Sequence, residues 1–150
     1  MNELDKVMKK IREEGDEKFF KYQGYPCVIL RQNQAMLHLC GYVGVPEGHS
    51  MYQHYPYEQR FENHFNVHGG INYFNFDLPA IDEVKRPSEE FWYLGFSCTH
   101  LGDIIPIDHK RCYQLKYEYE GRPFFHGDTY KDMSYVEKEI RNLVDQLKQL

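Results

Sequence analysis

The sequence predicts an α+β protein: a mainly antiparallel sheet with an amphipathic C-terminal helix packed on one face and a short N-terminal helix. Three runs rich in β-branched and aromatic residues, at 27–31, 63–76 and 91–98, have the composition of strands. Near the C-terminus, apolar residues instead recur at helical spacing. Because the 150 residues contain no repeat and no linker, we expect one α+β domain over residues 1–150.

The first predicted element is a short helix. Asn2 can cap its start and Gly15 can end it. The apolar residues between them follow helical spacing, at Leu4, Val7, Met8 and Ile11. The rest of this helix is very polar, so we expect it to dock on the protein or to mediate self-association.

Two paired strands are predicted next. CVILR at 27–31 resembles a buried strand, NQ at 33–34 can turn the chain, and MLHLCGYV at 36–43 pairs back. Alternation along the second strand predicts two faces: Leu37, Leu39 and Val43 on one, and His38, Cys40 and Tyr42 on the other.

A hairpin is predicted over residues 63–76, after a loop at 45–49 and an irregular surface segment rich in tyrosine and histidine. Phe65 and Val67 alternate with polar neighbours, and INYFNF returns after the turn. Gly69 and Gly70 supply the positive φ that a two-residue turn requires.

The remaining elements are a charged excursion, two strands and a helix. Residues 77–90 form the excursion, and strands are predicted at 91–98 and 112–119. Ser134 and Glu137 have the spacing of a capping box for the last helix. Its apolar stripe predicts packing on the sheet, through Val136, Ile140, Leu143, Val144 and Leu147.

The charge balance excludes one class of partner. With 18 basic and 23 acidic residues, the net charge is −5, and no duplex nucleic acid is expected as a partner. A small phosphate ligand remains possible, since backbone N–H groups and one or two arginines suffice to bind it. Aromatic residues make up 16% of the chain, with 13 Tyr and 10 Phe, which favours a surface suited to planar ligands.

The sequence also predicts a protein of the cytosol. No apolar run approaches the ~20 residues of a membrane span, and the N-terminal residues lack the apolar segment of a signal peptide. We therefore expect no membrane partner. Cys27, Cys40, Cys98 and Cys112 are scattered, as expected for reduced thiols.

The stretch FSCTHLGDIIP, residues 96–106, contains donors for three different kinds of site. Cys98, His100 and Asp103, with His68 as a fourth ligand, could bind zinc, but C-x-H-x-x-D is not a strong zinc pattern. Cys98 could be a nucleophile with a histidine as base, yet no catalytic motif is present. We expect no metal, no cofactor and no catalysis.

A turn that binds a ligand is the third reading. Thr99 and His100 offer donors, Gly102 permits close approach of a backbone, and Asp103 accepts from a base or sugar edge. The VHGG turn could present His68, Gly69 and Gly70 to a phosphate. Stacking rings and phosphate partners complete the candidates: Tyr42, Trp92 and Tyr130, with Arg60, Arg111 and Arg122.

Four segments together resemble a family of small bacteriophage proteins. They are GYVGVPEGH (41–49), VHGG (67–70), FWYLGFSCTHLGD (91–103) and TYKDMSYVEKEI (129–140). The family form of the third segment is closer to G-F-D-C-A-H-x-G-D, and Ser97 and Thr99 depart from it. The resemblance covers most of the chain from about Gly24 onward.

The resemblance implies an anti-defence protein in the cytoplasm of an infected bacterial host. Such a protein binds the cyclic di- or trinucleotide signal of the CBASS immune system and sequesters it uncleaved. It is expected to be a homo-oligomer. No individual binding residue follows from the resemblance. Two rivals remain open: a small phosphodiesterase or other hydrolase that uses His68, His100 and Asp103, and a phage inhibitor whose tyrosines bind another protein.

Overall fold

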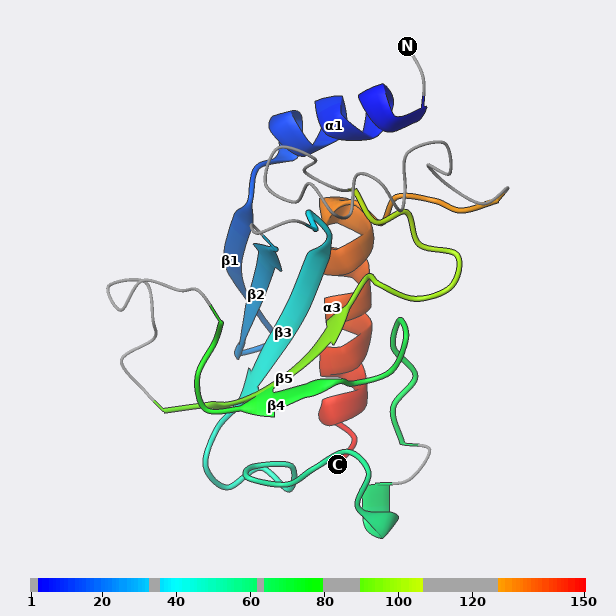
Figure 1. Cartoon of the computed structure of the whole chain (residues 1–150). Helices are drawn as coiled ribbons and strands as arrows, with labels where there is room; N and C mark the ends of the chain where they lie inside the picture. Colours follow the sequence, from blue (N-terminus) through cyan, green and yellow to red (C-terminus); the bar gives the residue numbers. More distant parts are fainter. Residues whose placement is uncertain (1–2, 33–35, 62–63, 80–89, 107–126) are drawn as a thin grey trace.

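A five-stranded antiparallel sheet organises the chain, with strand order β1-β2-β3-β5-β4 (Figure 1). The computed structural model describes residues 3–32, 36–61, 64–79, 90–106 and 127–150. The strands are β1 (Glu17–Tyr22), β2 (Tyr25–Arg31), β3 (Leu39–Val45), β4 (Tyr73–Asn75) and β5 (Trp92–Ser97). The other elements are the helices α1 (Glu3–Glu14) and α3 (Met133–Leu147) and the 3-10 turn η1 (Gln59–Phe61). The predicted fold class is therefore confirmed.

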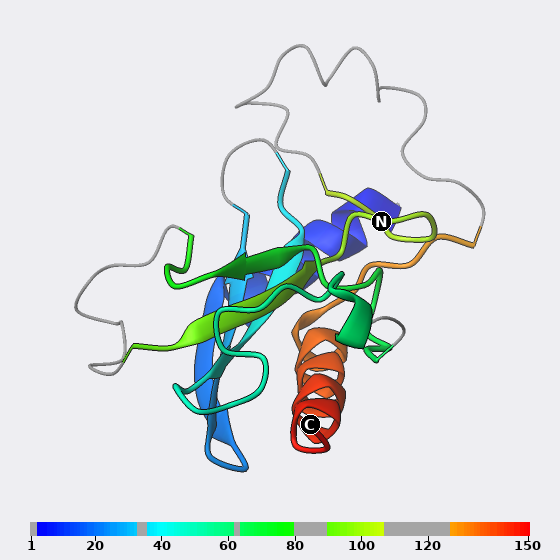
Figure 2. The same cartoon turned by 90° about the horizontal axis from the view of Figure 1, so that it is seen from below.

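Helix α3 covers one face of the sheet, as Figure 2 shows from below. The predicted stripe from Val136 to Leu147 is fully buried against the sheet. Leu39 and Val43 of β3 lie in the same core cluster, whereas Cys40 and Tyr42 belong to a cluster on the opposite face. The alternation predicted for this strand is confirmed at these four residues.

The middle of the sheet is made of two glycine–aromatic pairs. Gly41 of β3 lies opposite Phe96 of β5, and Tyr42 lies opposite Gly95. A Cβ atom at Gly41 would lie 2.7 Å from the Phe96 ring, and one at Gly95 would lie 2.5 Å from the Tyr42 ring. Each ring therefore lies across a glycine of the neighbouring strand, in a space that any side chain there would fill.

Helix α1 packs across the end of the sheet where α3 begins (Figure 1). Val7 and Ile11 are buried with Ile104, and Met8 packs against them, so the predicted apolar stripe is confirmed at these three helix residues. Gly15 ends the helix with φ 83°, and its N–H donates to the Ile11 carbonyl.

The predicted hairpin at 63–76 is wrong. Gly69 and Gly70 do form a turn with positive φ, but residues 64–67 are not a strand, and β4 pairs with β5. The cause is α3: the Asn66 N–H donates to Gln146, and the Asn66 carbonyl accepts from Asn142 and Gln146. The side chains of α3 thus take the backbone bonds that a hairpin partner would have taken.

One other prediction needs correction, and one strand was not predicted. The N-cap of α3 is Asp132, whose carboxylate accepts the Tyr135 N–H at 2.9 Å, and not Ser134. Strand β1 was not predicted at all, because EKFFKY is charged and largely exposed. The predicted turn at 33–34, most of the excursion at 77–90 and the strand at 112–119 lie outside the described residues.

Candidate functional site

Three of the quoted sequence segments converge on one buried carboxylate, that of Asp103. Asp103 lies shortly after β5. Residues 103 and 129 form a parallel β-bridge, which brings the residues before α3 next to Asp103. The VHGG turn approaches from another side and brings His68. The Asp103 side chain is 1% exposed, so its charge requires partners within the protein.

Asp103 has a hydrogen-bonding or charged partner at each of its oxygens. Oδ2 accepts from His68 Nε2 at 2.7 Å and from the His100 N–H at 3.0 Å. Oδ1 lies 2.9 Å from the ammonium nitrogen of Lys131. Lys131 also donates to the carbonyl oxygens of Gly102 and Thr129, so this lysine ties the turn to the approach of α3. We call Asp103, His68, Lys131 and Tyr135 the Asp103 cluster.

The partners of Asp103 decide its charge state. Burial alone raises the pKa of this carboxyl, but the hydrogen bonds from His68, the His100 N–H and Lys131 outweigh burial and leave the pKa below its ordinary value. Asp103 is therefore ionised at neutral pH. An ionised carboxylate can only accept, so His68 Nε2 carries the proton that it donates.

The second nitrogen of His68 continues the chain of hydrogen bonds. His68 Nδ1 lies 2.8 Å from the Tyr135 hydroxyl, which donates to it when the imidazole is neutral. The arrangement is a carboxylate, an imidazole and a hydroxyl in series, which is the geometry of a proton relay. Burial, followed by the charges of Glu139, Cys98 and Asp103, raises the pKa of Tyr135, so its hydroxyl stays protonated.

His100 lies directly over the VHGG turn. Its ring occupies the space that a side chain at Gly69 would need, and its centroid lies 5.9 Å from that of His68. His100 Nε2 is buried and has no hydrogen-bond partner among the residues that the structure describes. The structure thus brings together four candidate residues from two turns: His68, Gly69, His100 and Asp103.

A second buried charge lies beside the Asp103 cluster. Arg31 on β2 forms ion pairs with Glu14 and Asp16, at 2.9 and 3.0 Å, and donates to the Tyr130 hydroxyl at 2.8 Å. Tyr130 also donates to Glu14, whose other oxygen accepts the N–H of Met133. This network joins α1, β2 and the start of α3, and it fixes the hydroxyl of Tyr130, whose ring is half-buried.

His38 is a buried histidine in the same region. Burial lowers its pKa from 6.5 to about 4, against the opposing effect of the Asp103 charge. Its Nδ1 has no hydrogen-bond partner among the described residues. His38 is therefore neutral at physiological pH.

Two of the rings predicted to stack on a base are core residues. Tyr42 is 3% exposed and Trp92 is 7% exposed, and the indole N–H of Trp92 donates to the His54 carbonyl. Neither ring offers a face to a ligand, so we correct both assignments. Alternation along a strand predicts which residues share a face, but not that both faces of this sheet are covered.

Three other candidate residues, Gly70, Thr99 and Gly102, lie on the same two turns. Gly70 follows Gly69 in the turn, and Gly102 contributes the carbonyl that Lys131 binds. The Thr99 hydroxyl pairs with Ser97 at 3.0 Å. Arg111 and Arg122 lie outside the described residues.

Cys98 does not have the surroundings of a nucleophile. It is 2% exposed in the main core, and burial raises the pKa of its thiol to about 12. In the described part of the chain, no group of three His, Cys, Asp or Glu side chains is placed to hold a metal ion.

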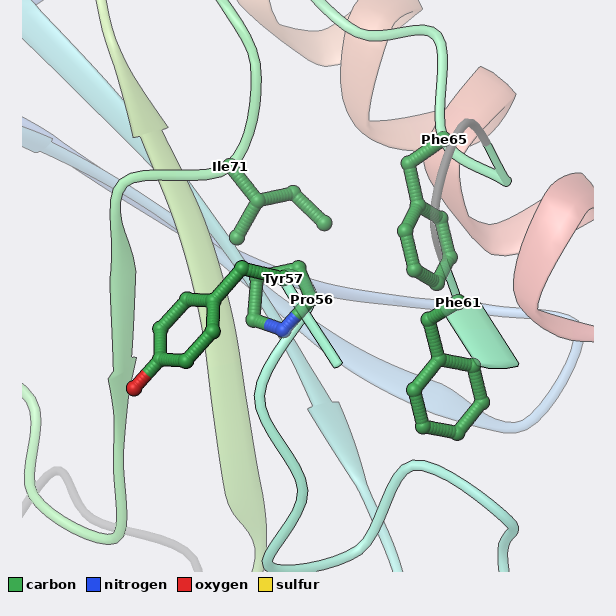
Figure 3. Close-up of a pocket in the computed structure, with 5 residues that line it drawn as sticks. All are labelled: Pro56, Tyr57, Phe61, Phe65 and Ile71. Carbon is green, nitrogen blue, oxygen red and sulfur yellow. The ribbon is translucent and has the colours of Figure 1, made fainter. Parts of the chain in front are cut away.

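An open aromatic groove lies next to the VHGG turn. It encloses about 220 Å³. Figure 3 shows the rings of Phe61 and Phe65 on one side of it and Pro56, Tyr57 and Ile71 on the other. Because Phe65 and Ile71 flank the turn, the contacts that fix the turn also fix two walls of the groove. We call this set of five residues the aromatic groove.

One wall of the aromatic groove extends into an exposed aromatic platform. Tyr57 is 71% exposed, and its ring lies parallel to that of Tyr55, with centroids 5.4 Å apart and an interplanar angle of 5°. Phe74 of β4 supports both rings edge-on. Arg60 lies 4.5 Å above the Phe61 ring, so a cation borders the groove.

The sequence analysis missed Lys131, Tyr135 and most of the groove. Lys131 and Tyr135 do occur in the quoted segment TYKDMSYVEKEI, and their approach to Asp103 depends on the 103–129 bridge, which has no local signal. The tyrosine-rich segment before η1 was predicted to be irregular surface, and its composition was the signal that could have indicated the groove.

No protein-family model matches this chain. Neither the curated proteins nor the solved structures gave a significant match. No helix in the part of the chain that the structure describes is both long and apolar enough to cross a membrane.

Proposed function

We propose that this chain is a phage anti-defence protein that binds a cyclic oligonucleotide immune signal and sequesters it without cleaving it. The family resemblance suggests the ligand, and the aromatic groove with its platform is the observation that supports the proposal. A base could stack on the ring of Tyr57, which is 71% exposed at the edge of the groove, whereas Phe61 is 4% exposed and forms part of the buried wall. Stacking of this kind contributes roughly 1–3 kcal/mol per base and requires no basic surface.

The charge around the aromatic groove fits a ligand with few phosphates. Arg60 is the cation that borders the groove, and the chain as a whole carries a charge of −5. A cyclic dinucleotide has only two phosphates, so one local guanidinium and backbone N–H groups can match it. A long nucleic acid strand would meet repulsion from the acidic remainder of the surface.

Preorganisation is the second argument for binding. Phe65 and Ile71 are fixed through Asn66, which three hydrogen bonds tie to α3, and through His68, which Asp103 and Tyr135 hold. A groove whose walls are fixed before binding loses little conformational entropy when a ligand enters. On this proposal, the Asp103 cluster supports the groove and performs no chemistry.

Binding and the role of Tyr57 can be tested together. A melting screen against cyclic di- and trinucleotides should raise the melting temperature with the cognate ligand, since a ligand at 100 times its Kd adds about 2.7 kcal/mol. Tyr57→Ala should weaken binding about 5- to 150-fold in calorimetry while leaving the melting temperature of the free protein unchanged. Tyr22→Ala, on the opposite edge strand, is the control and should bind normally. The absence of any shift with all nucleotides would reject the proposal.

A hydrolase is the second candidate, because the series Asp103–His68–Tyr135 has the geometry of a proton relay. His68 would then exchange a proton with the ligand through Tyr135. Incubating the nucleotide with the protein, denaturing the protein and separating the products distinguishes the two functions. Intact nucleotide recovered in stoichiometric amount supports sequestration, whereas linear product that disappears with His68→Gln supports the hydrolase.

A further inference from the structure

Among the strands that the structure describes, β1 lies at the edge of the sheet. It pairs with β2 along its full length, and in the described part of the chain no strand lies beyond it. The outward N–H and C=O groups of such a strand are a template for another strand. Its six residues, EKFFKY, are long enough to form a short ladder with a partner.

The two faces of β1 differ in what they contact. Lys18 pairs with Glu137 of α3 at 2.9 Å, and the Tyr22 hydroxyl donates to Asp145 of α3 at 3.2 Å. The alternate residues, Glu17, Phe19 and Lys21, point to the opposite face and are exposed. Phe19 is 38% exposed, an unusual position for a phenylalanine at the centre of a strand.

We propose that β1 pairs antiparallel with β1 of a second copy of this chain, about a two-fold axis at Phe19. In this register Phe19 lies opposite the partner's Phe19. Glu17 lies opposite the partner's Lys21, and the symmetry repeats this pair on the other side of the axis. Directly opposed aromatic rings and opposite charges both stabilise antiparallel pairs.

The charges also discriminate against neighbouring registers. An axis at Lys18 would place the two Lys18 residues opposite each other, and like charges in direct opposition destabilise a ladder; an axis at Phe20 would place Lys21 opposite the partner's Phe19 and leave its charge unpaired. The pattern of EKFFKY therefore favours the axis at Phe19, in which Glu17 and Lys21 each meet an opposite charge, while Lys18 keeps its ion pair with Glu137. A two-fold interface of this kind is closed, because both copies use the same edge.

This dimer leaves the aromatic groove accessible. The groove lies near β4, and the sheet order places β4 and β1 at opposite edges. The inference therefore stands independently of the ligand, and a dimer would carry two grooves at the outer ends of one continuous sheet.

Sedimentation equilibrium of the full chain over a range of concentrations tests the interface. The wild type should be a dimer in equilibrium with monomer. Glu17→Lys and Lys21→Glu should each raise the dimer Kd by about tenfold or more, because each places like charges opposite one another twice. The double variant Glu17→Lys with Lys21→Glu restores both pairs and should dimerise like the wild type. Lys138→Glu, an exposed reversal on α3, is the control for net charge.

Three outcomes would overturn the inference. They are a wild type that is monomeric at all concentrations, single variants that dimerise as tightly as the wild type, and a double variant that does not recover. Circular dichroism of each variant confirms that the fold is retained, so a loss of dimer cannot be attributed to unfolding. Phe19→Asp, which places two carboxylates at the axis, should abolish the dimer in the same assay.

Discussion

At the scale of single residues, Asp103 joins three separate segments of the chain. Its carboxylate contacts His68 of the VHGG turn and the His100 N–H of its own turn. It also contacts Lys131, which lies just before α3. The three segments are remote in sequence. A buried charge with well-placed partners has a small net effect on stability. Removing it leaves its partners buried without a counter-charge, which is strongly destabilising.

Asp103→Asn should therefore be strongly destabilising. The substitution leaves the Lys131 ammonium buried without its counter-charge, and we expect the free energy of unfolding to fall by about 3 kcal/mol. Urea denaturation measures the change. Asp145→Asn, which removes an exposed carboxylate on α3, should cost at most about 1 kcal/mol.

A second substitution separates charge from packing. Adding Lys131→Met to Asp103→Asn removes the stranded charge and should recover part of the lost stability. If the double variant is less stable than Asp103→Asn by the full cost of Lys131→Met alone, the two residues do not interact energetically.

The two glycines of the VHGG turn should respond differently to substitution. Both have positive φ, 67° at Gly69 and 81° at Gly70, so alanine is strained at either position. Only at Gly69 does the added Cβ also collide with the His100 ring; at Gly70 nothing lies within 4 Å. Thermal denaturation should show Gly69→Ala to be less stable than Gly70→Ala by about 1–3 kcal/mol. Equal melting temperatures would show that His100 moves away freely.

At the scale of elements, the start of α3 tests the correction made to its N-cap. Asp132 accepts the Tyr135 N–H, so Asp132→Ala should cost about 1 kcal/mol in urea denaturation. Ser134→Ala, at the position predicted from the capping-box spacing, should change stability by less than about 0.5 kcal/mol. The reverse order of the two effects would restore Ser134 as the cap.

Elements with strong local patterns were predictable, and those that depend on remote partners were not. The stripe of α3 and the runs of β2, β3 and β5 carry their own burial signal, because alternate or helically spaced residues face the core. Residues 64–67 have the same alternation, yet side chains of α3 capture the backbone at Asn66. Strand β1 carries a weak signal, since an edge strand buries few of its side chains.

The candidate site was predictable in part for the same reason. His68, Gly69, His100 and Asp103 were singled out by residue type and by the turns that carry them. Lys131 and Tyr135 could not be singled out in this way. A lysine just before a helix and a tyrosine in its first turn have many possible neighbours, and only the 103–129 bridge shows that they lie beside Asp103. Tyr42 and Trp92 were misassigned because aromatic composition does not distinguish a buried ring from an exposed one.

At the scale of the whole molecule, the free energy of unfolding should decrease as the pH is lowered, because of His38. Its pKa is lowered from 6.5 to about 4 in the folded chain, so the unfolded chain binds the proton more readily. The contribution of His38 is complete above pH 6.5 and is lost as the pH falls toward 4, which amounts to roughly 3 kcal/mol. Asp103, whose pKa is also lowered, loses its contribution only at lower pH, below its ordinary value of 3.8.

Urea denaturation between pH 7 and 4 measures this dependence. His38→Gln cannot titrate, so its stability should fall less steeply over this range than that of the wild type. His64→Gln removes an exposed histidine and should keep the slope of the wild type. An unchanged slope in His38→Gln would assign the acid sensitivity to other groups.

The glycine–aromatic pairs at the middle of the sheet have a consequence for how this protein can diverge. Gly41 with Phe96, and Gly95 with Tyr42, each share one space between two neighbours. Enlarging either glycine alone is blocked, and trimming either ring alone leaves a hole. In related chains, a larger residue at one position of a pair should therefore be accompanied by a smaller residue at the other. These positions of β3 and β5 should covary, whereas other core positions should vary independently.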